Sequence, residues 1–229
     1  MIKQIGTIPI DDAQALDLEK FKEMDYFAVK EFNLPIELMM ENAGLQLAKL
    51  IALSYPNLTN KILIGVGNGN NGGGGLVAAR RLAAWGFNVS LDLFTEVTKE
   101  LPKKQLERAL KFGVNNKPVD HPDIWVDAYL GFSQKLPLPD SLLQKIQTAN
   151  TSNCKRISLD IPTGYLGDAT QPHFNANKIL TLAALKNILL GLVGNTEIYL
   201  ADLGIPKVVY ERFGIKQPNF EISTLLHLQ

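Results

Sequence analysis

The sequence predicts an α/β fold, a three-layer αβα sandwich in which helices cover both faces of a mostly parallel central sheet. Three observations support this prediction. Short apolar segments alternate with segments of helical periodicity, which is the pattern of βαβ units. Two helical blocks stand before the first strand-like segment. A chain of 229 residues with 46% hydrophobic content can bury one full-sized core, so we expect residues 1–229 to form a single domain.

The two N-terminal helices lie within residues 11–53. Asn33-Leu34-Pro35 separates them, and Pro35 suits the start of the second helix. Strands and helices then alternate, and because crossovers between parallel strands are right-handed, the helices should cover both faces of the sheet. The expected strands are residues 61–66, 88–94, 124–128, 156–160, 178–182 and 197–200, and the expected helices between them are residues 76–85, 99–112 and 141–147, the last with Asp140 as its cap.

Charge balance and cysteine content exclude several classes of protein. Twenty-three basic and 23 acidic residues leave no net charge to attract a polyphosphate backbone, so we expect no nucleic-acid partner. The single cysteine, Cys154, has no partner for an intramolecular disulfide or a zinc site. No apolar stretch is long enough for a signal peptide or a membrane span. We therefore expect a cytoplasmic protein with no membrane partner.

A glycine-rich segment is the strongest functional signal. Residues 65–80 read G-V-G-N-G-N-N-G-G-G-G-L-V-A-A-R, a strand followed by two asparagines, four glycines and a helix. Each ordered glycine costs roughly 0.5–1 kcal/mol relative to alanine, so four in succession indicate close approach of the backbone to a ligand. We predict that residues 67–75 form a loop and that backbone N–H groups of residues 72–75, at the start of the helix, bind a pyrophosphate.

The same segment allows three other interpretations. It satisfies the G-x-G-x-x-G pattern of dinucleotide-binding folds, but the acidic residue expected about 20 positions later is replaced by Asp92 inside a strand or Glu96 beyond it. A phosphate-loop NTPase is excluded because Leu76 stands where that motif needs a lysine. A flexible linker would have no use for the paired asparagine amides.

Two aspartates end neighbouring strands of the expected sheet. Asp127 and Asp160 each close an apolar strand, and ligands of such folds bind at the carboxyl ends of strands. An aspartate at a strand end is also a common turn or cap residue. If both face the ligand, Asp160 is the candidate for proton exchange. Asn71, Asp127 and Thr163 offer hard oxygen ligands with one carboxylate, which suits a monovalent cation such as potassium better than magnesium or calcium.

Four motifs resemble those of one known family. They read M-M-E-N-A-G at residues 39–44, N-N-G-G-G-G-L-V-A-A-R at residues 70–80, V-D-A-Y-L-G-F-S at residues 126–133 and S-L-D-I-P-T-G at residues 158–164. In this order they resemble the YjeF N-terminal family, the NAD(P)H-hydrate epimerases. The resemblance continues through residues 181–186 and 199–206 and covers nearly the whole chain.

The resemblance implies a Rossmann-like enzyme of nicotinamide nucleotide repair. Such an enzyme interconverts the R and S forms of NADHX and NADPHX, the hydrated forms of NADH and NADPH. Asp160 would bind the substrate and serve in catalysis, and Asn71, Asp127 and Thr163 would hold one potassium ion per subunit. The implied substrate-binding residues are Asn70, Asn71, Gly72, Gly73, Gly74, Gly131, Phe132, Ser133, Gln134, Lys135, Leu136, Pro137 and Asp160.

The chain departs from the family at Gly74, because the family usually reads N-N-G-G-D-G at this point. Glycine forgoes the roughly 0.3–1 kcal/mol that a carboxylate gains near a helix N-terminus. Two hypotheses follow. One is a working epimerase in which Asp160 suffices, and the other is a non-catalytic nucleotide-binding or dimerisation module of the same fold.

The resemblance also bears on partners. The dehydratase domain to which this domain is often fused in bacteria has no room before Gln229, so we expect a separate NAD(P)HX dehydratase as functional partner. Met39, Met40 and the first helix would either fill the core or form the surface of a homodimer. Lys186 would either approach the ligand or be solvated.

Overall fold

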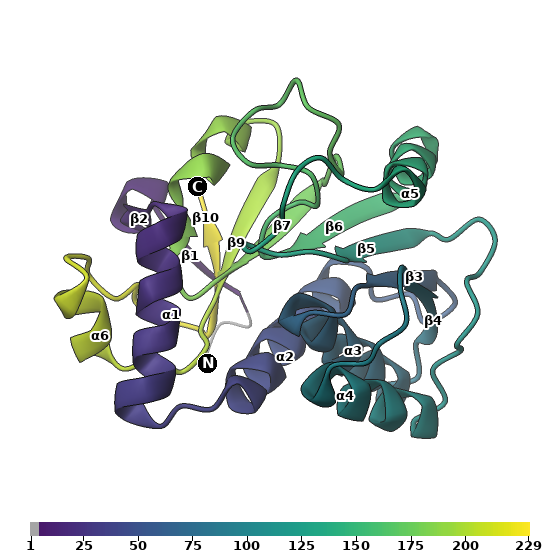
Figure 1. Cartoon of the computed structure of the whole chain (residues 1–229), viewed down its shortest axis with the longest axis horizontal. Helices are drawn as coiled ribbons and strands as arrows, with labels where there is room; N and C mark the ends of the chain where they lie inside the picture. The colour runs from purple at the N-terminus through teal and green to yellow at the C-terminus, as the bar shows by residue number, and fades with distance from the viewer. Residues whose placement is uncertain (1–4) are drawn as a thin grey trace.

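The computed structural model describes residues 5–229, and an eight-stranded sheet forms its centre (Figure 1). Six consecutive strands of this sheet are parallel, the next one is antiparallel to them, and the edge strand beside it is parallel to that one. The predicted α/β fold with a mostly parallel sheet is therefore confirmed. In the order in which they lie side by side, the strands are β1 Gly6–Ile8, β10 Leu225–Leu228, β9 Glu197–Ala201, β7 Lys178–Leu182, β6 Lys155–Leu159, β5 Ile124–Ala128, β3 Lys61–Val66 and β4 Asn88–Leu93.

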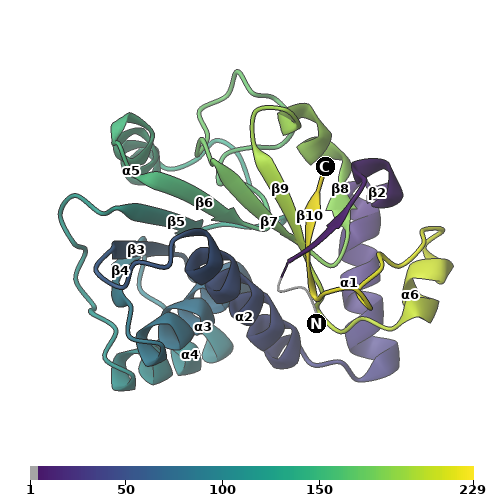
Figure 2. The same cartoon turned by 180° about the vertical axis from the view of Figure 1, so that it is seen from behind.

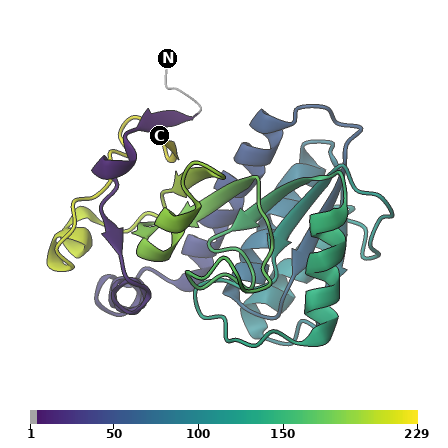
Figure 3. The ribbon, with the colours of Figure 1, turned by 90° about the horizontal axis from the view of Figure 1, so that it is seen from above.

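Helices cover both faces of this sheet (Figures 1 and 3). One face carries α2 Ile36–Ser54, α3 Asn70–Ala84 and α4 Glu100–Lys111, and the other carries α5 Asp140–Thr151 and the 3-10 helix η2 Asn187–Leu192. Successive side chains of a strand point to opposite faces, so in β3 Ile62 and Ile64 join the core under α2 and α3 while Leu63 joins the core under α5. Both faces are thus buried, which explains why these strands read as continuous apolar runs.

A third core lies beside the sheet, where α1 Leu18–Phe32 packs against α6 Lys207–Arg212 (Figure 2). The Asp17 carboxylate accepts a hydrogen bond from the backbone N–H of Lys20 at 2.8 Å and starts α1, and Asn33 ends it in the left-handed conformation at φ 48°. Ahead of α1, the short strand β2 Ala15–Leu16 follows the 3-10 helix η1 Ile10–Asp12 and pairs with β8 Leu185–Lys186. This pairing ties α1 to the segment after β7.

The start of α3 differs from the prediction. The helix begins at Asn70 rather than at residue 76, so all four glycines lie inside it. Their absent side chains let α3 pack closely: a Cβ on Gly75 would lie 2.6 Å from the Cβ of Ala128 in β5, and one on Gly73 would lie 2.6 Å from Met40 in α2. The glycine run is therefore a packing feature as much as a ligand feature.

Smaller differences concern ends and short elements. The prediction that Asp140 caps α5 is wrong, because Pro139 takes the cap position and Asp140 is the first helical residue. The elements β1, β2, β8, β10, η1, η2 and α6 were not predicted, since segments of two to six residues carry too little periodicity to be recognised. Within the described residues, no helix combines the length and the apolar character that crossing a membrane requires.

Candidate active site

A cavity of about 600 Å³ opens at the carboxyl ends of β3, β5 and β6. The N-terminus of α3, the loop after β5 and parts of α1 and α2 surround it. Eight of the predicted substrate-binding residues line this cavity: Asn70, Asn71, Gly74, Gly131, Phe132, Ser133, Gln134 and Asp160. The others, Gly72, Gly73, Lys135, Leu136 and Pro137, are not among its lining residues. The glycine-rich segment and the ends of β5 and β6 therefore surround the same cavity, as predicted.

The first turn of α3 supplies backbone donors to the cavity. Gly69 is the N-cap residue, and the N–H of Gly73 already bonds to the Gly69 carbonyl at 3.0 Å. The N–H groups without a helical partner are those of Asn70, Asn71 and Gly72. From Gly73 onward the N–H groups are bonded to carbonyls one turn earlier in α3, so of the predicted residues 72–75 only Gly72 keeps an N–H group for an anion. Gly72 is needed here because its Cβ would lie 2.0 Å from the carbonyl oxygen of Gly67.

Asp160 follows β6 directly and is held in the left-handed conformation at φ 70° with 2% of its surface exposed. This backbone conformation costs a non-glycine residue about 1–3 kcal/mol, so its surroundings must enforce it. The backbone N–H of Phe132 donates to Oδ2 at 2.9 Å, and the ammonium of Lys186 lies 2.8 Å from Oδ1. The contact with Lys186 has the geometry of an ion pair rather than of an aligned hydrogen bond. Asp160 is thus a buried carboxylate in the wall of the cavity.

Lys186 is entirely buried, so the interpretation as a solvated lysine is wrong. Its ammonium donates to the Leu182 carbonyl at 2.7 Å and to Thr181 Oγ1 at 3.1 Å, and lies 3.7 Å from the ring centroid of Phe21 in α1. Burial lowers the pKa of Lys186, and the neighbouring Asp160 opposes this shift. The pairing of β8 with β2 carries this lysine beneath α1. Nothing in the local sequence indicates that environment.

Asp127, near the end of β5, has no exposed surface and accepts four hydrogen bonds. Ser158 Oγ and the Thr163 N–H donate to Oδ2, both at 2.8 Å, and the Thr163 hydroxyl donates to Oδ1 at 2.6 Å, with the Tyr129 N–H at 3.3 Å. Burial nevertheless raises the pKa of Asp127 to about 6. Among the described residues, no basic side chain forms an ion pair with it.

Asn71 lies close to this cluster. Its side-chain amide donates to the carbonyl oxygens of Leu130 at 2.7 Å and Leu159 at 3.2 Å, and the Leu130 N–H donates in turn to Thr163 Oγ1. The three residues predicted to hold potassium are therefore neighbours. Their chemistry fits a monovalent cation, since the donors are oxygens and the one carboxylate lacks a basic partner.

Asp92 and Gln134 have structural roles that the sequence did not disclose. Asp92 accepts from the Tyr129 hydroxyl at 2.6 Å and pairs with Lys145 of α5 at 2.6 Å, so it is not available for a ribose. The Tyr129 ring occupies the space where a Cβ of Gly65 would lie. The Gln134 amide donates to the carbonyls of Pro162 and Tyr165 and accepts from the Gly164 N–H, which locks the loop after β5 onto the loop after β6.

Several residues of the cavity were missed by sequence reasoning. Met39 and Met40 are buried and line the cavity, which favours the packing interpretation over a dimer surface. Asp25 lines it from α1, and burial raises the pKa of Asp25 to about 6. Its sequence signal is its place on the apolar stripe of the helix, one turn after Phe21. The remaining unpredicted lining residues include Tyr26, Asn68, Thr95, Lys99, Leu182 and Leu203.

Comparisons with known proteins give the family. The family described as "YjeF-related protein N-terminus" matches residues 36–188. An NAD(P)H-hydrate epimerase of Anopheles darlingi is 32% identical over 222 residues, covering 92% of this chain and 96% of the relative. A bifunctional NAD(P)H-hydrate repair enzyme of Thermofilum pendens is 31% identical over 219 residues, covering 87% of this chain and 42% of the relative.

A solved structure agrees on the fold. The crystal structure of the yeast protein ynu0 superimposes with a TM-score of 0.84 at 23% identity and covers 94% of this chain and all of that one. The matched residues 36–188 include Asn71, Asp127, Asp160 and Thr163. With the sequence match extending over most of the chain, the protein belongs to the YjeF N-terminal family.

Proposed function

We propose that the protein is an NAD(P)H-hydrate epimerase that interconverts the R and S forms of NADHX and NADPHX. The observation that carries this proposal is Asp160, a buried carboxylate in the wall of a cavity at the start of α3. Relatives that carry the name NAD(P)H-hydrate epimerase match almost the whole chain. An enzyme of this kind needs one site for a pyrophosphate and an acid–base group some distance from it, and both features support the assignment.

In the proposed complex, the pyrophosphate of the substrate accepts hydrogen bonds from the free N–H groups at the start of α3, where the helix dipole favours an anion. The hydrated ring lies beside Asp160. The N–H of Phe132 and the ammonium of Lys186 hold the carboxylate in one orientation. Asp160 then exchanges a proton with the ring hydroxyl as this group departs and returns.

We also propose that Asn71, Asp127 and Thr163 hold one potassium ion. The support is the fully buried Asp127 carboxylate without a basic partner among the described residues. The ion would supply the missing positive charge and brace the loops after β5 and β6. Potassium should then raise the melting temperature more than sodium at equal ionic strength, since an ion that binds only the native state stabilises it. Asp127→Asn should remove the difference between the two salts, and an equal response to both salts in the wild type would refute potassium binding.

The alternative of a non-catalytic module rests on Gly74 alone, and no comparison favours it. A Cβ at position 74 would lie 3.0 Å from Leu159 Cδ2 and 3.8 Å from Ala43 Cβ, and Gly74 itself lines the cavity. We propose a separate NAD(P)HX dehydratase as functional partner, because the Thermofilum relative is named as a bifunctional repair enzyme. On the basis of the sequence, we also propose that the protein is cytoplasmic and forms a homodimer.

The direct test is an assay with purified R-NADPHX. The protein should bring the R and S forms to equilibrium faster than a protein-free control, as followed by chromatography or by a stereospecific dehydratase. If ligand binds but the two forms equilibrate at the control rate, the non-catalytic alternative holds.

A further inference from the structure

Among the residues that the structure describes, two that line the cavity carry a carboxyl group. Asp160 comes from the end of β6, and Asp25 comes from the middle of α1. The two therefore belong to different walls. Gly74, where the family pattern has its aspartate, supplies none.

The position of Asp25 is set by its helix. Phe21, Met24 and Ala28 form the buried stripe of α1, and Asp25 lies on the same side, one turn after Phe21. The Phe21 ring packs against Lys186 at 3.7 Å and against the Phe132 ring at 5.3 Å, and both of these residues contact Asp160. This face of α1 thus covers the pair of Asp160 and Lys186.

The Asp25 carboxyl is not used by the fold. Among the described residues, none donates a hydrogen bond to it and none forms an ion pair with it, in contrast to Asp127 and Asp160. Charged groups on an otherwise apolar helix stripe are costly unless they are partnered. A carboxyl that lies at such a position and lines a cavity is a candidate for chemistry.

We propose that Asp25 is a second acid–base residue of the epimerase, serving the face of the hydrated ring opposite to the face that Asp160 serves. This inference rests on the proposed function. Inversion at the ring carbon requires the hydroxyl to leave from one face and water to return at the other. A carboxyl fixed in one wall serves one face, so a second carboxyl in another wall completes the reaction.

The proton transfers balance. As the hydroxyl leaves, one carboxylic acid gives its proton to the hydroxyl oxygen, the C–O bond breaks, and the lone pair of the adjacent ring nitrogen forms a C=N double bond, releasing water. As water adds at the other face, a new C–O bond forms, the C=N electron pair returns to nitrogen, and the other carboxylate accepts the proton. Nothing is oxidised or reduced, and one proton moves from one carboxyl to the other.

The test compares the wild type with Asp25→Asn and with Glu23→Gln, a matched control at an exposed position of the same helix. The substrate is R-NADPHX in buffer prepared with H₂¹⁸O. We expect Asp25→Asn to lower kcat by about 100-fold or more with little change in KM, as loss of an acid–base group does. Asp25→Glu should recover part of the rate, and Glu23→Gln should match the wild type.

A pH profile gives a readout that a structural role would not alter. Besides burial, which raises the pKa of Asp25, the charges of Lys186 and Asp160 act on this group, and Asp25 shares the cavity with Lys99, Tyr26 and Tyr129. The wild-type kcat/KM should change slope near pH 6, and Asp25→Asn should lack that change.

Three results would overturn the inference while leaving the proposed function standing. They are an unchanged kcat in Asp25→Asn, an effect confined to KM, and wild-type inversion without ¹⁸O in the hydroxyl. The last measurement needs no variant, so the inference can be refuted even if Asp25→Asn fails to fold. A wild type that does not equilibrate the two forms at all would refute the proposed function itself.

Discussion

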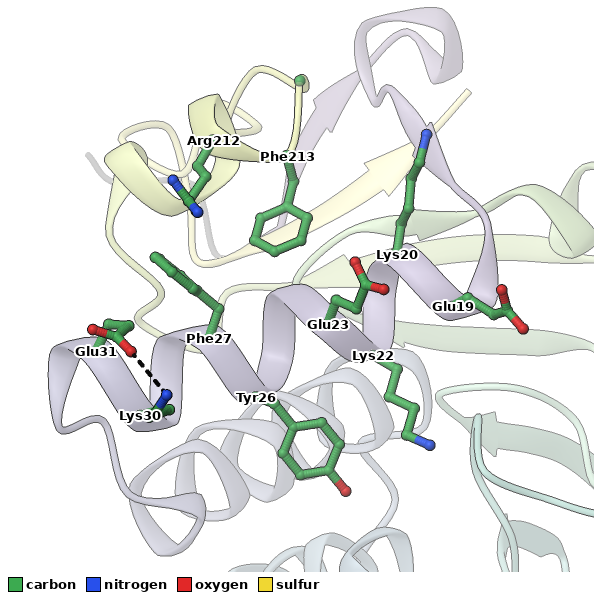
Figure 4. Close-up of a pocket in the computed structure, with 11 residues that line it drawn as sticks. Glu19, Lys20, Lys22, Glu23, Tyr26, Phe27, Lys30, Glu31, Arg212 and Phe213 are labelled. Atoms are coloured by element: carbon green, nitrogen blue, oxygen red, sulfur yellow. Dashed lines mark ion pairs between the residues drawn. The ribbon is translucent and has the colours of Figure 1, made fainter.

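Helix α1 borders two hollows of opposite character. The larger, of about 1140 Å³, lies between α1 and α6, where Phe27 and Phe213 point toward one another and charged side chains surround them (Figure 4). The smaller, of about 600 Å³, is the candidate active site. Charges at the larger hollow are exposed, as in the ion pair of Lys30 and Glu31 at 3.5 Å, whereas Asp160 and Lys186 at the smaller one are buried.

The contrast shows that burial of charge, rather than volume, locates the chemistry. Exposed pairs are solvated and screened, and they contribute about 0–1 kcal/mol wherever they lie. Buried charges have to be held by partners in a defined geometry, which costs stability and specifies orientation. Substitutions around the two hollows should therefore differ in effect.

The largest effect is expected from Asp160→Asn. Asparagine tolerates the left-handed backbone conformation, so the chain should fold, but the proton-exchanging group is lost. We expect the rate of epimerisation to fall by about 10⁴-fold. Circular dichroism verifies the fold, and Asp168→Asn, an exposed aspartate on the following loop, is the control. Retained activity would remove Asp160 from the catalytic role.

Lys186→Met should have the largest effect on stability. It leaves the Asp160 carboxylate buried without its cation, so we expect the free energy of unfolding in urea to fall by about 3–5 kcal/mol. The double variant with Asp160→Asn should be far more stable than the sum of the single effects predicts, because neither charge is then left alone. Strictly additive losses would contradict the coupling.

The raised pKa of Asp25 should make the stability of the protein depend on pH. Burial raises its pKa from 3.8 to about 6, so the native state holds this proton more tightly than the unfolded state. Its stabilising contribution is full below about pH 4 and is lost as the pH rises through about 6. Asp25→Asn should flatten this decline by up to about 3 kcal/mol.

The measurement is urea unfolding of both proteins across this pH range. Burial also raises the pKa of Asp127 to about 6, so Asp127 lowers the free energy of unfolding with rising pH in the same way in the wild type and in Asp25→Asn. The difference between the two profiles therefore isolates Asp25. Parallel profiles would show that Asp25 titrates as it does in the unfolded chain.

The smallest effects are expected at the larger hollow. Arg212 lies over the Phe27 ring at 4.8 Å, a contact worth about 0.5–1 kcal/mol at an exposed site. Arg212→Met should therefore change the free energy of unfolding by no more than this and leave the epimerisation rate unchanged. A loss of activity beyond about tenfold in Arg212→Met would contradict this contrast, because it would show that the larger, exposed hollow also takes part in the reaction.

The central strands were predictable because parallel strands buried on both faces form apolar runs bounded by turns. The start of α3 was not, because glycine is a poor helix former, and only the close packing against Met40 and Ala128 accounts for four glycines in a helix. Asp160 was predicted from its place after a strand. Asp25 and the burial of Lys186 were not, because α1 and β8 lie far apart in the chain and come into contact only in the folded structure.

The sequence by itself determined the αβα architecture, the order of its main elements and the strand ends at which polar residues gather, since these follow from hydrophobic periodicity and local turn chemistry. Only the tertiary structure decided which charges are buried together. The pair of Asp160 and Lys186, the Asp25 carboxyl in the cavity and the hydrogen-bonded carboxylate of Asp127 depend on contacts between segments far apart in the chain. These charged side chains are buried by contacts with distant segments, so the residues next to them in the sequence do not indicate their burial.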